Sequence, residues 1–258
     1  IDGSAGTTGL RIADRLSNRD DLTIIRLPES LRKDPIARKE AINSADIVFL
    51  CLPDAAAIEA VSLAENPDVK IIDTSTAHRT DPNWTYGFPE LSGQREKIKN
   101  SNRIANPGCH ASGFVALVAP LVQKGIVPAD AMLTCFSLTG YSGGGKKMIA
   151  EYEAGNRSAL LKPPRQYALT QQHKHLKEMV KICGLENAPV FCPIVGDFYS
   201  GMEVTVPVVK SQLQGTLDDV KACYKAYYGE GMVHFTDEGD ENGLLSAGKY
   251  ADKDTMEI

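Results

Sequence analysis

The chain has 258 residues, of which 43% are hydrophobic and 24% charged, a composition typical of a soluble globular protein. This length suits one large domain or two of medium size and excludes a disulfide-stapled mini-protein. The formal net charge of -5 at pH 7 argues against a general nucleic-acid binder. The longest apolar stretches, 47–52 and 113–122, are shorter than the ~18 residues of a membrane span, so we expect no membrane partner.

Six cysteines are scattered among apolar residues, and no two of them form a C-x-x-C pair. This distribution predicts reduced thiols and a cytoplasmic protein. The sequence opens at Ile1 without the charged and apolar regions of a secretory leader. Ile1 and Asp2 run straight into a glycine motif that a strand ought to precede, so we expect the N-terminus to have been cut.

Short apolar runs alternate with alanine-rich helical patterns in the first hundred or so residues. Strands are predicted over 22–27, 45–52 and 69–73, and helices over 9–16, 36–42 and 55–63. Strand–helix–strand alternation predicts an α/β fold with a parallel sheet of Rossmann type.

The pattern changes after about residue 107, so we expect a first domain over 1–107 and a second over 108–258. A buried helix is predicted over 111–122, kinked where Pro120 interrupts its hydrogen bonds. Strands are predicted over 131–139, 190–195 and 202–209, and an amphipathic helix over 217–228. Because no regular helices are expected between those strands, the pattern predicts an α+β domain with a mixed or antiparallel sheet.

A glycine-rich loop, Gly3-Ser4-Ala5-Gly6-Thr7-Thr8-Gly9, precedes the first predicted helix. Glycines let the backbone approach a pyrophosphate, and a helix N-terminus offers N–H donors with a partial positive charge. The G-x-x-G-x-x-G spacing alone is weak and equally describes a plain turn. Followed by helix and strand, it predicts a dinucleotide site at these seven residues.

The residues after the next predicted strand should distinguish NAD from NADP. Ser30, Arg32 and Lys33 could hold the 2′-phosphate of NADP, whereas an acidic residue such as Glu29 is the type that binds the ribose hydroxyls of NAD. We predict NADP. The alternative is that these polar side chains are merely solvated on a surface turn.

The segment Asn106-Pro107-Gly108-Cys109-His110 places a cysteine in a turn immediately before the apolar helix. Because a helix N-terminus stabilises thiolate over thiol, this position favours a reactive cysteine. The other five cysteines lie in predicted strands or helices and are expected to be inert. A cysteine phosphatase would need an arginine six residues further on, where Val115 stands instead.

Six motifs occur in chain order over nearly the whole sequence. They are GSAGTTG (3–9), DTSTAHR (73–79), GFPE (87–90), NPGCHASG (106–113), SGGGKK (142–147) and Tyr167 followed by His173-Lys174-His175. Together they resemble the N-acetyl-gamma-glutamyl-phosphate reductase family, in the shorter of its two sequence types. The resemblance implies a Rossmann domain followed by an α+β catalytic and dimerisation domain, as in aspartate-semialdehyde dehydrogenase.

The resemblance also implies an activity, the NADPH-dependent reduction of N-acetyl-L-glutamyl 5-phosphate to N-acetyl-L-glutamate 5-semialdehyde in arginine biosynthesis. It implies a homodimer or homotetramer as well. Two family segments are missing, the first strand before Gly3 and a C-terminal glycine-rich turn with a helix returning to the nucleotide domain. Reductases of aspartyl or aminoadipyl phosphate remain alternatives, as does a non-catalytic nucleotide-sensing module.

By the same resemblance, Cys109 matches the nucleophile and His173 the acid/base histidine. His110 is the competing histidine, but adjacent helical residues project about 100° apart, so it should not face the Cys109 sulfur. His173 and His175 would share one face of a strand and could then bind zinc. We predict no metal, because further ligands at suitable spacing are missing from the sequence.

Substrate contacts are expected from Arg79, Glu90, Tyr167 and His175. Arg79 could equally be a solvated loop charge, and Glu90 could instead orient a loop. Ser142 and Gly143 are expected beside the nicotinamide. The positive charge that a carboxylate- and phosphate-bearing substrate needs is available from five residues, Lys146, Lys147, Arg157, Lys162 and Arg165.

Overall fold

A computed structural model describes residues 1–4, 6–229 and 231–258, so the prediction for Ala5 lies outside the described residues. The chain divides into two compact units. The first consists of Ile1–Pro89 and Gly93–Pro107, and the second of Glu90–Ser92 and Gly108–Ile258. None of the helices in the described part has the length and apolar character that crossing a membrane requires.

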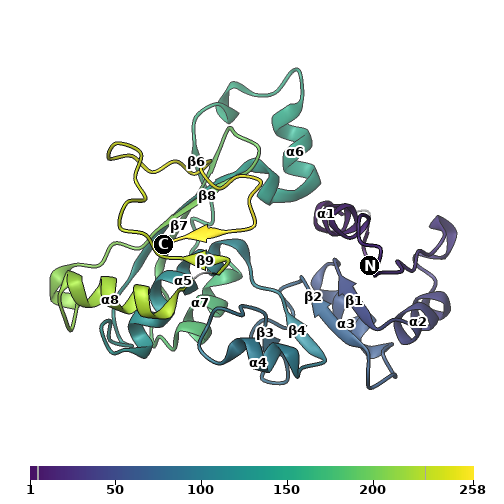
Figure 1. Cartoon of the computed structure of the whole chain (residues 1–258). Helices are drawn as coiled ribbons and strands as arrows, with labels where there is room; N and C mark the ends of the chain where they lie inside the picture. Colours follow the sequence, from purple (N-terminus) through teal and green to yellow (C-terminus); the bar gives the residue numbers. More distant parts are fainter. Residues whose placement is uncertain (5, 230) are drawn as a thin grey trace. The chain divides into compact units, whose positions relative to one another are not determined.

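The first unit is built on a four-stranded sheet in the order β1-β2-β4-β3, and every neighbouring pair is parallel (Figure 1). Its strands are β1 (Ile47–Leu50), β2 (Lys70–Asp73), β3 (Thr85–Tyr86) and β4 (Arg103–Ala105). Its helices are α1 (Thr7–Leu16), the 3-10 turn η1 (Glu29–Leu31), α2 (Pro35–Ser44), α3 (Asp54–Ser62) and α4 (Gln94–Lys99). The predicted parallel sheet is therefore confirmed.

The core of the first unit lies where α2 and α3 pack against β1 and β2. Leu50 and Ile71 from the strands and Ala57 and Ala60 from α3 are fully buried in one cluster. Parallel strands covered by crossover helices need this kind of apolar run, which is why residues 45–52 and 69–73 were recognisable as strands.

The predicted strand over 22–27 is wrong, because this segment has no regular secondary structure. Leu22 and Ile25 are exposed rather than buried. A β-branched run becomes a strand only where neighbouring strands take up its N–H and C=O groups and bury its side chains. Within the described residues, Asp2 makes the one bridge ahead of α1, and it pairs with Leu50 of β1.

The second unit contains a mixed four-stranded sheet in the order β6-β7-β5-β8. Its strands are β5 (Thr134–Gly140), β6 (Arg165–Gln166), β7 (Val190–Gly196) and β8 (Met202–Thr205). β5 and β7 are parallel, whereas β6 and β8 are antiparallel to their neighbours. A small parallel pair, β9 (Val233–His234) and β10 (Met256–Glu257), lies near the C-terminus (Figure 1).

Helices lie between β5 and β7, contrary to the expectation of none, whereas none lies between β7 and β8. The helical elements of the second unit are α5 (Cys109–Gln123), η2 (Tyr141–Gly144), α6 (Gly145–Glu153), η3 (Ala159–Leu161), α7 (His175–Cys183), η4 (Lys210–Gln212) and α8 (Leu217–Tyr227). Both α6 and α7 lie between β5 and β7, because two parallel neighbours cannot be joined by a hairpin and need a long crossover.

The long helix α5 continues through Pro120 to Gln123. Proline has no N–H, so the carbonyl of Ala116, four residues earlier, loses its helical donor. The Tyr228 hydroxyl donates to that carbonyl at 2.6 Å and replaces the missing bond. The Tyr224 hydroxyl donates to the carbonyl of Leu117 at 2.6 Å in the same way. Two tyrosines at the end of α8 therefore stabilise the helix that begins at Cys109.

Replacing Tyr228 with phenylalanine should lower the free energy of unfolding by about 1–3 kcal/mol, the cost of a buried acceptor without a donor. The midpoint of urea unfolding measures this change. Tyr199 is the matched control, since its side chain is 50% exposed and Tyr199→Phe should leave the midpoint unchanged. Equal midpoints for the two variants would contradict the proposed replacement of the proline bond.

One face of the mixed sheet is buried and the other is open. Along β5, Cys135 and Ser137 are buried whereas Phe136 is 43% exposed, as alternating strand residues predict. On β7, Phe191 is buried and Val190 is 51% exposed. The pairing register brings the outward residues of the two strands together, and we call this set the open sheet face: Phe136, Leu138, Val190, Cys192 and Ile194.

Candidate active site

Cys109 is the first residue of α5 and its side chain is exposed. Gly108 precedes it in extended conformation. The Gly108 N–H donates at 2.8 Å to a carboxylate oxygen of Glu178, a buried residue of α7. The sulfur therefore lies at the positive end of a long helix, where a thiolate is stabilised.

Four of the other five cysteines have the opposite surroundings, and the fifth, Cys192, is half-buried. Burial raises the pKa of the Cys51, Cys183 and Cys223 thiols, and that of Cys135 to about 12, with Cys192 and Glu203 adding to the effect at Cys135. These thiols stay protonated at neutral pH, which makes them poor nucleophiles.

His110 forms a hydrogen-bonded cluster with residues of two other segments. Its Nδ1 lies 2.6 Å from the Ser137 hydroxyl on β5, and its Nε2 lies 2.6 Å from the Tyr167 hydroxyl. Tyr167 follows β6 and is held by its own N–H, which donates to the carbonyl of Pro193 at 3.0 Å. His110 thus points away from solvent into this cluster, as only 3% of it is exposed.

The electrostatics of the cluster connect it to Cys109. Burial, with the charge of His173 adding to it, lowers the pKa of His110 to about 4. Burial also raises the pKa of Tyr167, and the negative charge of a Cys109 thiolate raises it further. At neutral pH the imidazole and the phenol are therefore both uncharged. Cys109 directly precedes His110, whose ring is bonded to Tyr167, so the cysteine and the phenol belong to the same part of the second unit.

His173 and His175 lie at the start of α7 rather than on a strand, so the expected strand placement of this pair is wrong. His175 is the first residue of the helix, and its N–H donates to His173 Nδ1 at 3.2 Å. Helix N-termini leave such N–H groups without partners, and a side-chain acceptor satisfies them. In a neutral His173, accepting at Nδ1 leaves the proton on Nε2.

The rings of His110 and His173 both pack against Phe191, and the His175 ring lies against those two histidines. The His173 ring is 4.6 Å from that of His175 and 5.9 Å from that of His110. It is also 6.1 Å from the ring of Tyr167. Among the described residues, no group of three or more His, Cys, Asp or Glu is arranged to hold a metal ion. The ring contacts and hydrogen bonds place Tyr167 and the three histidines in one cluster of the second unit, and His110 of this cluster follows Cys109 in the chain.

The glycine loop of the first unit is closely packed against the end of β1. Gly3 has φ of +85°, and a Cβ there would lie 2.3 Å from the carbonyl oxygen of Cys51. A Cβ on Gly9 would lie 2.4 Å from the carbonyl oxygen of Gly3. α1 begins at Thr7 after Gly6, which has no side chain to cap the helix. A helix N-terminus beside a tight glycine loop fits a pyrophosphate.

The residues predicted to bind the 2′-phosphate of NADP lie around η1. Ser30 and Lys33 are exposed. Arg32 forms an ion pair with Glu29, the acidic residue of the type that would bind the ribose hydroxyls of NAD. Its guanidinium would have to leave that carboxylate before it could bind a phosphate.

The side chain of Arg79 donates hydrogen bonds to backbone carbonyls that follow β2 and β4, and so connects the carboxyl ends of these strands. Its Nε donates to the carbonyl of Asn106 at 2.9 Å, and its Nη2 donates to that of Thr74 at 3.0 Å. Ligands of α/β sheets bind at this edge. Arg79 therefore supports the segment that leads to Gly108, whether or not it also contacts a substrate.

A buried polar group inside the DTSTAHR motif was missed in the sequence analysis. The Asp73 carboxylate accepts from the Ser75 hydroxyl and is 2.6 Å from His78 Nδ1. The His78 ring stacks on Trp84 with centroids 4.1 Å apart. The motif itself could have indicated this group, since an aspartate at a strand end that is followed by serine and histidine is suited to a hydrogen-bonded turn. This arrangement holds the loop that carries Arg79.

The remaining predicted residues are spread over the second unit. Glu90 is half-buried near Tyr228, whose pKa is raised first by burial and to a lesser degree by this carboxylate. The Ser142 N–H donates to the carbonyl of Tyr199 at 2.9 Å, which anchors η2, and Gly143 is exposed beside it. Among the basic residues, Arg157 is already paired with Asp197 at 2.6 Å.

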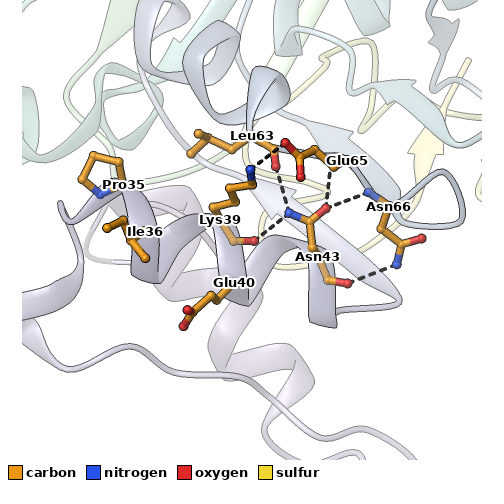
Figure 2. A pocket seen from close by; sticks show the side chains of 8 residues that line it. All are labelled: Pro35, Ile36, Lys39, Glu40, Asn43, Leu63, Glu65 and Asn66. Carbon is orange, nitrogen blue, oxygen red and sulfur yellow. Dashed lines mark hydrogen bonds and ion pairs between the residues drawn. The ribbon is translucent and has the colours of Figure 1, made fainter.

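A hollow in the first unit lies between α2 and the segment after α3, and contains none of the predicted site residues (Figure 2). Figure 2 shows Asn43 at its centre. The Asn43 amide donates to the carbonyls of Lys39 and Leu63. Its oxygen accepts from the N–H groups of Glu65 and Asn66. These bonds satisfy Asn43 fully, so it joins two elements of the fold.

Both units match known semialdehyde dehydrogenase domains. Residues 4–101 match the model of the semialdehyde dehydrogenase NAD binding domain, and residues 109–257 match that of the semialdehyde dehydrogenase dimerisation domain. The structure resembles an aspartate semialdehyde dehydrogenase from Francisella tularensis, with a TM-score of 0.67 at 15% identity over 99% of this chain and 87% of that one. These matches define the class as semialdehyde dehydrogenase.

Curated relatives identify the family within that class. The N-acetyl-gamma-glutamyl-phosphate reductase of Burkholderia lata is 45% identical over 233 residues, covering 89% of this chain and 74% of its own. The enzyme of the same name from Sinorhizobium medicae is 43% identical over 266 residues, covering 100% of this chain and 86% of its own. The chain belongs to the N-acetyl-gamma-glutamyl-phosphate reductase family, a family of oxidoreductases.

Proposed function

We propose that this chain reduces N-acetyl-L-glutamyl 5-phosphate to N-acetyl-L-glutamate 5-semialdehyde, releasing phosphate, as a step of arginine biosynthesis. The observation that carries the chemistry is the exposed Cys109 as the first residue of α5, directly before His110 of the cluster with Tyr167. Family membership supports the substrate. The raised pKa of the buried Cys135, Cys183 and Cys223 thiols and of the half-buried Cys51 thiol makes these four poor nucleophiles, and Cys109 is the cysteine at a helix start.

The reaction starts with attack of the Cys109 thiolate on the acyl carbon. The sulfur–carbon bond forms, the carbon–oxygen bond to phosphate breaks, and inorganic phosphate leaves with the electron pair. The product is a thioester on Cys109. Splitting the reaction into two easier steps is the advantage of such covalent catalysis.

NADPH, when bound, supplies the hydride that reduces the thioester carbonyl. His173 donates a proton to the oxygen of the resulting thiohemiacetal and then takes it back as the carbon–sulfur bond breaks. Aldehyde leaves and the thiolate is regenerated. The bond between His175 N–H and His173 Nδ1 supports this role, because it orients the ring and keeps Nε2 as its proton-bearing atom.

The proposed cofactor is NADP, held at its pyrophosphate by Gly3, Gly6 and Gly9 and the start of α1. The close packing of Gly3 and Gly9 supports this fit, since side chains at either position would clash. Ser30, Lys33 and Arg32, once released from Glu29, would hold the 2′-phosphate. A structural relative from Candida albicans was solved with NADP, at a TM-score of 0.63 and 16% identity. Ser142 and Gly143 are proposed to border the nicotinamide.

Aspartyl phosphate and aminoadipyl phosphate remain the competing substrates. An assay of the purified chain with all three acyl phosphates, each with NADPH and NADH, tests the proposal. We expect turnover with N-acetylglutamyl phosphate and NADPH to exceed every other combination at least tenfold. Faster reduction of aspartyl phosphate would reject the proposed substrate, and equal rates with NADH would reject the choice of NADP.

We also propose that the chain is a homodimer in the cytoplasm. The support for the dimer is the open sheet face, whose exposed Phe136 and Val190 lie in a domain of the dimerisation type. Two such faces packed together would bury these side chains. The cytoplasm is suggested by the cysteines, all six of which are thiols.

Phe136→Glu places a charge on the open sheet face and should weaken the dimer by about 2 kcal/mol or more, roughly 30-fold in its dissociation constant. Light scattering during gel filtration would then report the mass of a monomer at low micromolar concentration. Leu169→Glu is the control, because Leu169 is 72% exposed and lies outside that face. A Phe136→Glu variant that keeps the dimer mass would contradict the proposed interface.

A further inference from the structure

Ser137 is wholly buried on β5 and its hydroxyl lies 2.6 Å from His110 Nδ1. In residues 1–4, 6–229 and 231–258 this hydroxyl has no second hydrogen-bond partner. A buried hydroxyl almost always donates its proton to an acceptor. The acceptor within reach is Nδ1 of His110, so that nitrogen must carry a lone pair.

His110 is a neutral imidazole at pH 7, since burial and the nearby His173 lower its pKa to about 4. A neutral imidazole has one N–H and one accepting nitrogen. Because Nδ1 accepts from Ser137, the proton lies on Nε2. This N–H then donates to the Tyr167 oxygen, which is 2.6 Å away.

Tyr167 therefore accepts through its oxygen and keeps its own O–H. No acceptor for that proton lies in the part of the chain that the structure describes. The phenol stays protonated, because burial and Cys109 raise its pKa. A protonated hydroxyl beside the nucleophile is suited to bind the oxygen on which negative charge develops.

We infer that Ser137, His110 and Tyr167 form a hydrogen-bond chain of fixed direction that presents the Tyr167 hydroxyl to the carbonyl oxygen of the acyl substrate. This inference rests on the proposed function. Tyr167 is the catalytic member, while His110 and Ser137 are positioning residues. Negative charge forms on the carbonyl oxygen when Cys109 attacks and again when hydride arrives, so the same donor acts in both steps.

Kinetics on matched variants test the chain. Tyr167→Phe should lower kcat about 100-fold, the usual effect of losing one oxyanion donor, with a smaller change in KM. His110→Asn keeps an acceptor for Ser137 but cannot reach Tyr167, and should lower kcat by a similar factor. The double variant should be no slower than Tyr167→Phe. His110→Gln, whose amide nitrogen lies near the place of Nε2, should recover much of the loss.

Independent effects would overturn the inference, that is, a double variant slower by the product of the two single losses. Ser137→Ala keeps the test valid if changes at the buried His110 prevent folding. It should lower kcat roughly 2- to 10-fold, the equivalent of one hydrogen bond, and have no effect in the Tyr167→Phe background. An unchanged kcat for Ser137→Ala would also contradict the chain.

Nitrogen-15 NMR of the chain labelled at its five histidines tests the direction without any activity. The signals absent from His110→Gln belong to His110. At pH 7 they should report a protonated Nε2 and an unprotonated Nδ1, and an Nδ1–H tautomer or a charged ring would overturn the inference. If the tautomer is as expected but no acyl phosphate is reduced, the proposed function fails and the hydrogen-bond chain stands.

Discussion

Cys109→Ser is expected to reduce turnover at least ~10³-fold, since loss of a catalytic nucleophile removes the covalent route altogether. A serine hydroxyl at the start of α5 is a far weaker acid than a thiol, and the helix N-terminus cannot ionise it at neutral pH. NADPH oxidation with N-acetylglutamyl phosphate measures the loss. Binding of NADPH, followed by its fluorescence, should be unchanged, because the glycine loop belongs to the first unit.

Cys223→Ser is the matched control for this substitution. The Cys223 thiol lies 3.6 Å from the carbonyl of Pro120, and a serine hydroxyl can donate to the same carbonyl. This variant should keep turnover within about twofold of the unmodified chain. Near-normal turnover in Cys109→Ser, or equal losses in the two variants, would reject the nucleophile assignment.

His173→Asn should lower kcat by about 10²–10⁴-fold, the usual contribution of a general acid–base residue. The asparagine oxygen can take the place of Nδ1 and accept from His175 N–H, so the start of α7 is preserved. What is lost is Nε2, the atom that exchanges a proton with the substrate oxygen. The pH dependence of kcat should lose the limb that this proton transfer produces, which a purely structural change would not remove.

His234→Asn is the control for the histidine substitution. His234 lies in β9, beside Tyr250 and Glu257, and belongs to none of the groups around Cys109. Its replacement should leave kcat within about twofold. If His175→Asn abolishes the pH limb while His173→Asn keeps it, the acid–base role belongs to His175 instead.

Much of the first unit could be predicted from local sequence because most side chains of β1 and β2 are buried or half-buried. Residues 45–52 and 69–73 are nearly continuous apolar runs, and such runs require burial on two sides. The run 22–27 has the same composition but is exposed. Residues 45–52 and 69–73 include strands that pair with neighbouring strands, whereas 22–27 pairs with none in the described part of the chain. A local sequence pattern does not contain this information on pairing.

The second unit was harder to predict because its order depends on contacts that are distant in sequence. β5 and β7 are parallel neighbours separated by α6 and α7, and β6 is only two residues long. The H-x-H pair ends at His175, the first residue of α7, and its sequence suits a strand as well as a helix start. Packing against α5 stabilises α7 as a helix, and the Glu178 carboxylate accepts a hydrogen bond from the Gly108 N–H at the start of α5.

Some residues of the candidate site could be predicted from the sequence, whereas others depend on contacts between distant segments. Cys109 could be predicted because a turn followed by an apolar helix is a local signal, and the family resemblance pointed to His173 and Tyr167. The role of His110 could not, because its partners Ser137 and Tyr167 come from other segments. The expectation that His110 does not face the Cys109 sulfur follows from helix geometry and stays a prediction.

The most direct test of the account is to trap the thioester. The chain is mixed with N-acetylglutamyl phosphate without NADPH, quenched in acid and digested, and its peptides are weighed. The account predicts one N-acetylglutamyl group on the peptide that contains Cys109, and none in Cys109→Ser. Turnover in the parallel assay with that peptide unmodified, or with the acyl group on another cysteine, would contradict it.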